Sequence, residues 1–510
     1  MKSLTVFALV VFHIVASVSG QGLEFYVSND DGSDSWDGTS ESNVDGSDNG
    51  PWKTLDHAIR EIRKIRPNPP TASDAVTISM LPGKYFLSSR LDMDERDSYT
   101  TIKALYDEET AISGGVVLNG EWSEDGEIKS TTFQGPCGEA FVDTFRLFPA
   151  REPNLPDIGY NKNIALPPYH TVKDLLVETE TCTRDETGYS QNCPDDDRLG
   201  FVFEDEFDSQ WTHLDQTRVL VFHSWVAEYA TVGNVTEENG VSKVFFKEPL
   251  KEAPIGQYVQ SGGWRYIIYN NKAILDTPGE YICIDNGDGS STFSYIHPDE
   301  PDIEDLPVVI AQLTQLMLLN RVTDVRFEGI KFKHSSSGGV DGYNYGSETA
   351  LKVLSSQNLV MTDCELSSTG MIGMYVTDSS NVHITKSVFT DIGGHGLMVQ
   401  YNEVDLKGGM FDVSVDNNMF DGCGKNNFWQ PACIRLGGDK NMTIRNNDIT
   451  NVPYTPIAVR GLLHEESYWE DNGVTEPTRD DYVFHIEYNN IYDYGLGILS
   501  DFGAVYLGEG

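Results

Sequence analysis

A short pattern that recurs along the second half of the chain limits its fold more than any other feature. Each copy reads apolar, any, apolar, any, any, small or Asn, any, apolar, and six copies follow residue 320. The shortest spacing between copies, 23 residues, is the length expected for one coil, and longer spacings indicate inserted loops. The copies begin at Val325, Leu359, Val382, Val413, Met442 and Phe484.

The pattern predicts a strand followed by a turn. Alternating apolar positions are typical of a half-buried strand, and the small or Asn position marks a turn where side chains of successive coils stack. We expect Asn418, Asn447 and Asn489 to form such a ladder. A second short strand recurs about ten residues later, for example at 374–376 and 397–399. Two strands per coil without helical periodicity predict an all-β protein with a parallel β-helix.

The N-terminal part of the chain contains the only helix that we expect. Thr54 is a suitable N-cap, and Pro67 follows the expected end of the helix. A helix here would cover the open end of the β-stack, which every solenoid has to protect. The residues expected on its apolar face are Leu55, Ala58, Ile59, Ile62 and Ile65.

The coil pattern divides the chain into four parts. Residues 1–20 read as a signal peptide, 21–141 as an N-terminal cap with the first coils, and 321–510 as β-helix coils. Between 142 and 320 the pattern is absent, and hairpin-like strands such as Arg218–Phe222 predict a β-rich insertion.

The first twenty residues predict secretion. A positive charge at Lys2 precedes a short apolar run and a group of small residues, as in a cleaved signal peptide. No later run approaches the ~20 apolar residues of a membrane-spanning helix. The sequons at Asn234 and Asn441 predict N-glycosylation. We therefore expect a secreted, extracellular glycoprotein that does not associate with a membrane.

The charge of the chain restricts its partners. It has 36 basic and 79 acidic residues, for a net charge of −43, which excludes nucleic acid as a partner. A polysaccharide, the extracellular matrix or a mineral surface remain as partners. We expect no cofactor and no dedicated metal site. The acidic loop with Asp30, Asp31, Asp34 and Asp37 lacks EF-hand spacing and could bind Ca²⁺ only weakly.

Seven cysteines are too few to form a disulfide scaffold in 510 residues, so we expect local disulfides. Cys182 with Cys193 and Cys423 with Cys433 each enclose a polar loop, and these are the favoured pairs. The odd number leaves one cysteine unpaired. Phe428 and Trp429, inside the second loop, could stack on a sugar ring or pack against the rim of the fold.

Five short motifs occur in a characteristic order: residues 50–55 (GPWKTL), 81–85 (LPGKY), 112–115 (ISGG), 149–154 (PAREPN) and 275–280 (LDTPGE). Together they resemble a family of right-handed parallel β-helix proteins of the pectate-lyase-like kind. That family includes bacterial glycoside hydrolases of the β-xylosidase and fucosidase type. The resemblance implies a right-handed β-helix and an activity on carbohydrates.

The resemblance also implies a catalytic residue. The motif Leu499-Ser-Asp-Phe-Gly-Ala-Val-Tyr506 looks like a family signature in which the Asp is the catalytic carboxylate, here Asp501. This chain has Phe502 where relatives usually have Gly, which would crowd the site.

Counting along the coils predicts the surroundings of Asp501. A four-residue insertion would align Val505 with the inward residues Val376, Val399 and Val459, and would place Asp501 at the entrance of the strand, in the column of His395 and Thr455. A retaining glycosidase needs a second carboxyl group ~5–5.5 Å away, about one coil along the stack. Glu465 and Glu466 are the nearest candidates on the preceding coil. The outward column expected to bind sugar hydroxyls is Thr377, Gln400, Gly437, Arg460 and Tyr506.

Two functional hypotheses follow. The first is a glycoside hydrolase acting on extracellular polysaccharide, with Asp501 as nucleophile or base and Gln400, Arg460 and Tyr506 as substrate-binding residues. The second is a non-enzymatic acidic matrix protein that associates with cations or mineral. The last coil reaches Gly510 without a closing segment, so we expect that further coils, and with them a general acid, are missing.

Overall fold

The structure is a computed structural model that describes most of the chain after residue 21. The segment that we interpret as a signal peptide, Cys182, Cys193, Glu465 and Glu466 lie outside the described residues. The described ranges are 22–43, 47–155, 163–176, 183–184, 190–191, 198–203, 211–223, 225–251, 265–338, 348–400, 411–437, 440–460 and 484–507.

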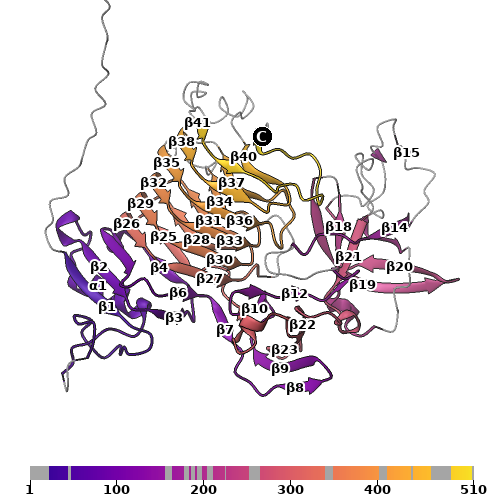
Figure 1. Cartoon of the computed structure of the whole chain (residues 1–510), viewed down its shortest axis with the longest axis horizontal. Coiled ribbons are helices and arrows are strands. Elements are labelled where there is room, and N and C mark those ends of the chain that lie inside the picture. Colours follow the sequence, from indigo (N-terminus) through magenta and orange to yellow (C-terminus); the bar gives the residue numbers. More distant parts are fainter. Residues whose placement is uncertain are drawn as a thin grey trace, which may run out of the picture.

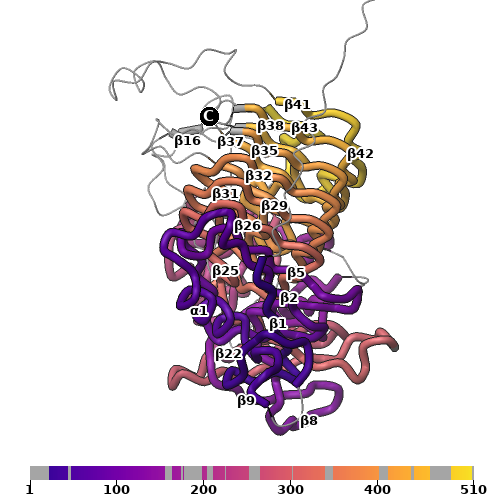
Figure 2. The backbone as a smooth tube through the Cα atoms, turned by 90° about the vertical axis from the view of Figure 1, so that its left-hand side faces the viewer, coloured from indigo at the N-terminus to yellow at the C-terminus, as the bar shows by residue number. Residues whose placement is uncertain are grey.

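Three parallel sheets wind into a β-helix whose coils stack along one axis (Figures 1 and 2). One coil consists of β26 (Thr323–Glu328), β27 (Lys331–Ser335) and β28 (Thr349–Leu354). Each of these strands pairs in parallel with its counterpart in the next coil, namely β29 (Gln357–Thr362), β30 (Glu365–Thr369) and β31 (Ile372–Thr377).

The three sheets extend over the whole β-helix, and we call them the first, second and third sheets. The first sheet also contains β1 (Leu23–Val27), β2 (Val76–Met80), β5 (Thr100–Ala104), β32 (Ser380–Thr385), β35 (Phe411–Asp416), β38 (Lys440–Arg445) and β41 (Phe484–Glu487). The second contains β3 (Gly83–Phe86), β6 (Thr110–Ser113), β33 (Val388–Ile392), β36 (Met419–Cys423), β39 (Asp448–Thr450) and β42 (Asn490–Ile491). The third contains β4 (Leu91–Met93), β25 (Met317–Asn320), β34 (Leu397–Gln400), β37 (Ala432–Gly437), β40 (Thr455–Arg460) and β43 (Val505–Leu507).

The prediction of two strands per coil was therefore wrong, because the recurring pattern spans two strands. The first two apolar positions lie on the first sheet, whereas the last apolar position, such as Phe332 or Phe389, lies on the second sheet. A sharp turn separates them. The residue before the small or Asn position has a positive φ in each of the six coils, at Gly329, Asp363, Lys386, Asn417, Asn446 and Tyr488.

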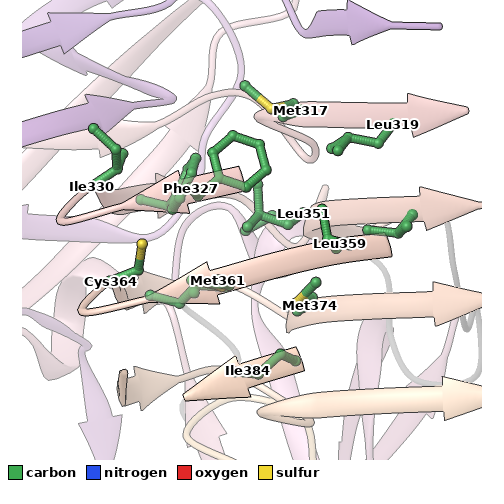
Figure 3. Packing of buried hydrophobic residues seen from close by; sticks show 14 of the residues in the cluster. Met317, Leu319, Phe327, Ile330, Leu351, Leu359, Met361, Cys364, Met374 and Ile384 are labelled. Carbon is green, nitrogen blue, oxygen red and sulfur yellow. The ribbon is translucent and has the colours of Figure 1, made fainter. Parts of the chain in front are cut away.

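Inward side chains from all three sheets form a continuous core (Figure 3). On the first sheet Phe327 is aligned with Met361, which is aligned with Ile384, and all three are at most 2% exposed. Burying each such side chain contributes about 1.5–3 kcal/mol. The periodic apolar positions of the sequence are therefore the core of the β-helix.

The predicted asparagine ladder is confirmed inside the turn between the first and second sheets, where Asn418 and Asn447 are buried and Asn489 is partly buried. Asn418 Nδ2 donates to Asn447 Oδ1 at 3.1 Å, and Asn447 Nδ2 donates to Asn489 Oδ1 at 2.9 Å. Each of these oxygens also accepts a hydrogen bond from the backbone N–H of the preceding Asn. Ser387 and Cys364 extend this column toward the N-terminus.

Helix α1 (Leu55–Ile65) begins and ends where the sequence predicts. The Thr54 side chain caps it by accepting from the His57 N–H at 3.2 Å. Four of its apolar residues join the core at the N-terminal end of the stack, but Ile65 is 57% exposed, so its predicted place on the buried face was wrong. Among the described residues, no helix is long and apolar enough to span a bilayer.

Sheets whose strands pair antiparallel, apart from the parallel pair β12–β22, project from one side of the β-helix between β7 and β24 (Figure 1), and we call them the antiparallel sheets. A four-stranded sheet contains β7 (Gly115–Val117), β10 (Ala140–Val142), β11 (Phe145–Arg146) and β24 (Val308–Ala311). A five-stranded sheet contains β8 (Ser123–Asp125), β9 (Ile128–Gln134), β12 (Phe148–Pro149), β22 (Glu280–Asp285) and β23 (Ser290–Ile296). A seven-stranded sheet contains β13 (Arg151–Glu152), β14 (His170–Leu175), β17 (Gly200–Phe203), β18 (Arg218–Phe222), β19 (Ala227–Glu238), β20 (Val241–Phe246) and β21 (Arg265–Tyr269).

Two disulfides lie among the described residues. Cys423–Cys433 confirms one of the two favoured pairs, and Cys364 is buried and free. The second disulfide, Cys137–Cys283, was not predicted, since its cysteines are 146 residues apart. It joins the segment before β10 to β22 and so holds two antiparallel sheets together.

Candidate functional site

A cleft of about 750 Å³ lies where the antiparallel sheets meet the turns of the β-helix. One wall comes from the antiparallel strands and includes Arg218, Tyr229 and Asp285. The opposite wall comes from the turns after the second sheet and includes Met371 and Asn426. Its volume lies within the range of small-molecule binding sites, about 300–1,000 Å³.

Glu139 is the carboxylate held at the junction of the two walls. It immediately precedes β10 and is only 7% exposed. Its carboxylate accepts from the Ser337 backbone N–H at 3.1 and 3.3 Å and from Asn426 Nδ2 at 3.1 Å. Both donors belong to β-helix turns, so the β-helix wall orients a carboxylate that the segment before β10 supplies.

Amide side chains organise the wall formed by the antiparallel strands. Gln216 accepts from the Asp285 N–H at 2.8 Å and donates to the Asp285 carbonyl at 2.9 Å. Asn270 donates to the Gln216 carbonyl at 3.1 Å, and its Oδ1 accepts from the Cys283 N–H at 3.1 Å. The exposed acids Asp215 and Asp285 lie beside these amides, and Lys247 Nζ donates to the Asp215 carbonyl at 2.6 Å.

Aromatic rings complete this wall. The rings of Tyr229 and Tyr269 lie 5.9 Å apart, and Tyr281 donates to the Gly138 carbonyl at 3.4 Å. Burial raises the pKa of Tyr269 and of Tyr281, so both stay neutral hydroxyls. The cleft thus combines amides, neutral hydroxyls, aromatic rings and three carboxylates. These groups donate to and accept from hydroxyls, and aromatic rings pack against the apolar faces of ligands.

Asp501 and Tyr506 lie together, but outside the residues that line this cleft. Tyr506 Oη donates to Asp501 Oδ2 at 3.2 Å, and Asp501 is exposed. The ring of Phe502 packs edge-on against Tyr494, with ring centroids 6.0 Å apart.

The predicted alignment of the last coil was wrong by two residues. Val505 pairs with Ile457, and Leu507 takes the position aligned with Val459. The insertion before β43 is thus six residues long rather than four. A shift of two residues keeps the side-chain alternation of the strand, so Val505 and Leu507 stay in the inward columns, where they are 39% and 72% exposed.

The alignment expected for the outward column is found except at its end, although Thr377 is only 3% exposed, and the role of the column in binding sugar hydroxyls stays a prediction. Thr377, Gln400, Gly437 and Arg460 are aligned across four coils, but Tyr506 is aligned with Ala458 and not with Arg460. Gln400 is exposed, whereas the side chain of Arg460 lies outside the described parts of the structure. In the observed pairing of β43 with β40, Asp501 does not align with His395 and Thr455. The prediction that it lies in their column was therefore wrong.

Phe428 and Trp429 pack at the rim. Phe428 is 1% exposed and Trp429 is 8% exposed, and Phe428 belongs to a cluster with residues of β18 and β21. An isolated bridge joins Trp429 to Val226 of the antiparallel part. These rings therefore attach the disulfide loop to the antiparallel sheets.

The remaining predicted residues lie on the surface. Asn234, on β19, and Asn441, on β38, are both exposed. In the acidic N-terminal loop, Asp34 accepts from the Lys53 and Thr54 N–H groups, and Asp37 accepts from Thr39. No cluster of three or more possible metal-ligating residues occurs among the residues that the structure describes.

The sequence reasoning missed the cleft. Glu139 and Asn426 are 287 residues apart, and neither lies in a recurring pattern. The one signal available in the sequence was the cysteines outside the favoured pairs. Pairing Cys137 with Cys283 would have placed Glu139, which follows Cys137 by two residues, close to β22.

Comparisons with known proteins agree with this architecture. Residues 308–430 match a family model described as "Right handed beta helix region". A solved structure described as a glycoside hydrolase is 18% identical, with a TM-score of 0.72, and the match covers 95% of this chain and 85% of that chain. A complex of XylC with xylose is 13% identical, with a TM-score of 0.46, and the match covers 92% of this chain and 62% of that chain. No curated protein matches the sequence.

The protein is a right-handed parallel β-helix protein that carries antiparallel sheets on one side. At this level of identity, the likeness to the glycoside hydrolase establishes a shared fold over nearly the whole chain.

Proposed function

We propose that the protein binds a polysaccharide in the cleft between the antiparallel sheets and the β-helix, and hydrolyses a glycosidic bond there. The observation that carries this proposal is the cleft itself, with Glu139 held between its walls. Amides, hydroxyls and aromatic rings around a fixed carboxylate are the groups that sugar recognition requires.

Glycoside hydrolysis commonly uses two carboxyl groups, one of which protonates the leaving oxygen. We assign this acid role to Glu139. Asp215 and Asp285 line the same cleft and are the candidates for the second carboxylate. Asp501 remains the rival candidate from the sequence, supported by its hydrogen bond from Tyr506.

The test compares hydrolysis by the wild type, Glu139→Gln and Asp501→Asn. Release of reducing sugar is measured on xylan and other extracellular polysaccharides, and release of phenol on aryl-glycosides. Loss of the acid is expected to lower kcat by roughly 10²–10⁴-fold. We expect this loss in Glu139→Gln and near-wild-type rates in Asp501→Asn. The reverse result would move the site to Asp501.

A second candidate function follows from the charge. A net charge of −43 favours association with cations or mineral in the extracellular matrix. If no polysaccharide is hydrolysed, retention of the protein on calcite at moderate salt would support this alternative.

Secretion and glycosylation belong to the same proposal. The Cys137–Cys283 and Cys423–Cys433 disulfides are typical of oxidising compartments, and Asn234 and Asn441 are exposed. A mass decrease on treatment with an N-glycosidase, lost in Asn234→Gln/Asn441→Gln, would test it.

A further inference from the structure

The glycosylation sequon at Asn234 lies on a β-bulge of the seven-stranded sheet. Asn234 belongs to β19, which pairs with β20, and the register of this pair shifts between Val232 and Asn234. Gly233 packs so closely on β20 at this point that an added Cβ would lie 3.2 Å from the backbone nitrogen of Lys247. A bulge adds one residue to a strand and so re-aims the side chains that follow it.

The bulge directs Asn234 to the cleft side of the sheet. Val232 and Val235, on either side of the bulge, are buried in the core cluster on the other side of the sheet, whereas Asn234 is exposed. Tyr229 and Thr231, which precede the bulge, line the cleft. In a regular strand Asn234 would face the same side as Val232, because side chains alternate. The extra residue therefore moves Asn234 from the core side to the side on which the cleft lies.

Asn234 is also close to the rim of the cleft. It is aligned with Phe245, which precedes the cleft residue Lys247 by two positions on β20. Two residues of a strand span roughly 7 Å. The Lys247 backbone N–H donates to the Thr231 carbonyl at 2.9 Å, so the strand pair that carries the sequon also forms this part of the rim. A sugar chain attached to Asn234 would begin beside it.

The rim is polar where such a chain would reach it. The side chains of Lys247 and Asp215 are 47% and 64% exposed, and both residues line the cleft. An N-glycan is bulky, hydrated and compatible with a polar surface. Because it is attached at one edge, it can extend across the entrance without disturbing any core contact.

We propose that a glycan on Asn234 covers the entrance of the cleft and admits short saccharides more readily than long polymers. This inference rests on the proposed binding of polysaccharide in the cleft and adds a determinant of substrate length. A short saccharide can enter beside the glycan, whereas a long polymer has to displace it from the rim.

The experiment uses the full chain secreted from a eukaryotic host, with occupancy of Asn234 measured by mass spectrometry of the glycopeptide. Thr236→Ala removes the sequon and leaves Asn234 in place, whereas Thr236→Ser keeps the sequon. Asn441→Gln, which removes the sequon on β38 of the first sheet, is the matched control for loss of a distant glycan.

The first readout does not depend on hydrolysis. It is the acylation of Lys247 by an amine-reactive ester carried on a long polymer, followed by mass spectrometry. Thr236→Ala should be acylated at Lys247 about fivefold faster than the wild type or more, since removal of a covering group uncouples access from the glycan. A small ester should react equally with both proteins. Lys64 of α1, whose side chain is 66% exposed, is the internal reference and should react equally throughout.

The second readout is kcat/KM on xylan and on a short aryl-glycoside. Thr236→Ala should raise it about fivefold or more on the polymer and leave it unchanged on the short substrate. Thr236→Ser and Asn441→Gln should match the wild type on both. If no form hydrolyses either substrate while Lys247 acylation changes as expected, the proposed hydrolysis fails and the covering of the cleft stands.

Three results would each overturn the proposal. The first is an Asn234 without glycan in the secreted protein. The second is equal acylation of Lys247 by the polymer-linked ester in the wild type and Thr236→Ala. The third is an equal gain on both substrates, which would mean that the glycan occupies the cleft instead of covering its entrance.

Discussion

The side chain of Asn447 joins three coils of the β-helix. Its Oδ1 accepts from the backbone N–H and the side chain of Asn418, and its Nδ2 donates to the Val415 carbonyl and to Asn489 Oδ1. It is 1% exposed, so no solvent can replace these bonds. An apolar residue at this position would leave two backbone groups, the Asn418 N–H and the Val415 carbonyl, without these hydrogen bonds.

We therefore predict that Asn447→Ala lowers the free energy of unfolding by about 2–4 kcal/mol. Urea denaturation followed by fluorescence measures the change. The control is Asn490→Ala, which removes one exposed hydrogen bond to Asp448 and should cost less than about 1 kcal/mol. Equal losses in the two variants would show that the buried ladder has no special role.

His334 gives the β-helix a pH dependence. It is buried, with Nδ1 2.9 Å from Ser113 Oγ and Nε2 2.8 Å from the Asp143 carbonyl. Burial is the main cause that lowers its pKa to about 4. Since the folded pKa lies below the ordinary value of 6.5, the unfolded chain binds the proton more readily.

Stability should thus fall as pH decreases from about 6.5 to about 4, by up to about 1.4 kcal/mol per pH unit from this residue. His334→Asn, which does not titrate and tolerates the positive φ of this position, should flatten that part of the profile. Denaturation midpoints measured across this range test it. An unchanged slope in the variant would assign the acid sensitivity to other groups.

At the scale of elements, Arg146 connects the β10–β11 hairpin to the β-helix. Its guanidinium donates to Asp391 Oδ1 at 2.6 Å and to the Thr369 and Asp391 carbonyls at 2.8 and 3.1 Å. Its side chain is 6% exposed, so the ion pair is buried. Removing one member of such a pair leaves the other charge uncompensated.

Arg146→Met should destabilise the protein by about 3–5 kcal/mol and loosen the hairpin from the coils. Amide hydrogen exchange should rise in 140–146 while staying slow in β35 and β38. Arg60→Met, at an exposed ion pair with Asp56, is the control and should have little effect. Loss of protection throughout the chain would mean that the hairpin and the coils unfold as one unit.

The sequence predicted those elements whose residue patterns lie within a short segment of the chain. Helix α1 was predictable from its N-cap and proline, and the core columns were predictable from their recurrence. The strand on the second sheet was missed because a turn of only two residues, one of them in the αL conformation, such as Asn446, separates it from the strand before it. The shift in the last coil arose because strand alternation cannot distinguish alignments that differ by two residues.

At the scale of the molecule, the cleft depends on long-range contacts that no local pattern encodes. The cysteines of the Cys137–Cys283 disulfide, which lies beside Glu139, are 146 positions apart in the sequence, whereas those of Cys423–Cys433 are only 10 apart. In a loop-closure model these separations correspond to stabilisation by about 5 and about 3 kcal/mol.

Cys137→Ala/Cys283→Ala should therefore destabilise the protein more than Cys423→Ala/Cys433→Ala. It should also weaken polysaccharide binding, because it releases one wall of the cleft. Denaturation midpoints and binding isotherms of both double variants measure these effects. A larger loss of stability on removal of Cys423–Cys433, which closes the shorter loop, would contradict the loop-closure model.

The proposed function depends most on where the polysaccharide binds. The most direct measurement is hydrogen exchange of the wild-type protein with and without the oligosaccharide that the hydrolysis screen selects. We predict slower exchange in segments 137–139, 216–218 and 426–427, which line the cleft. Protection confined to 500–507, around Asp501 and Tyr506, would contradict the assignment of the cleft as the binding site.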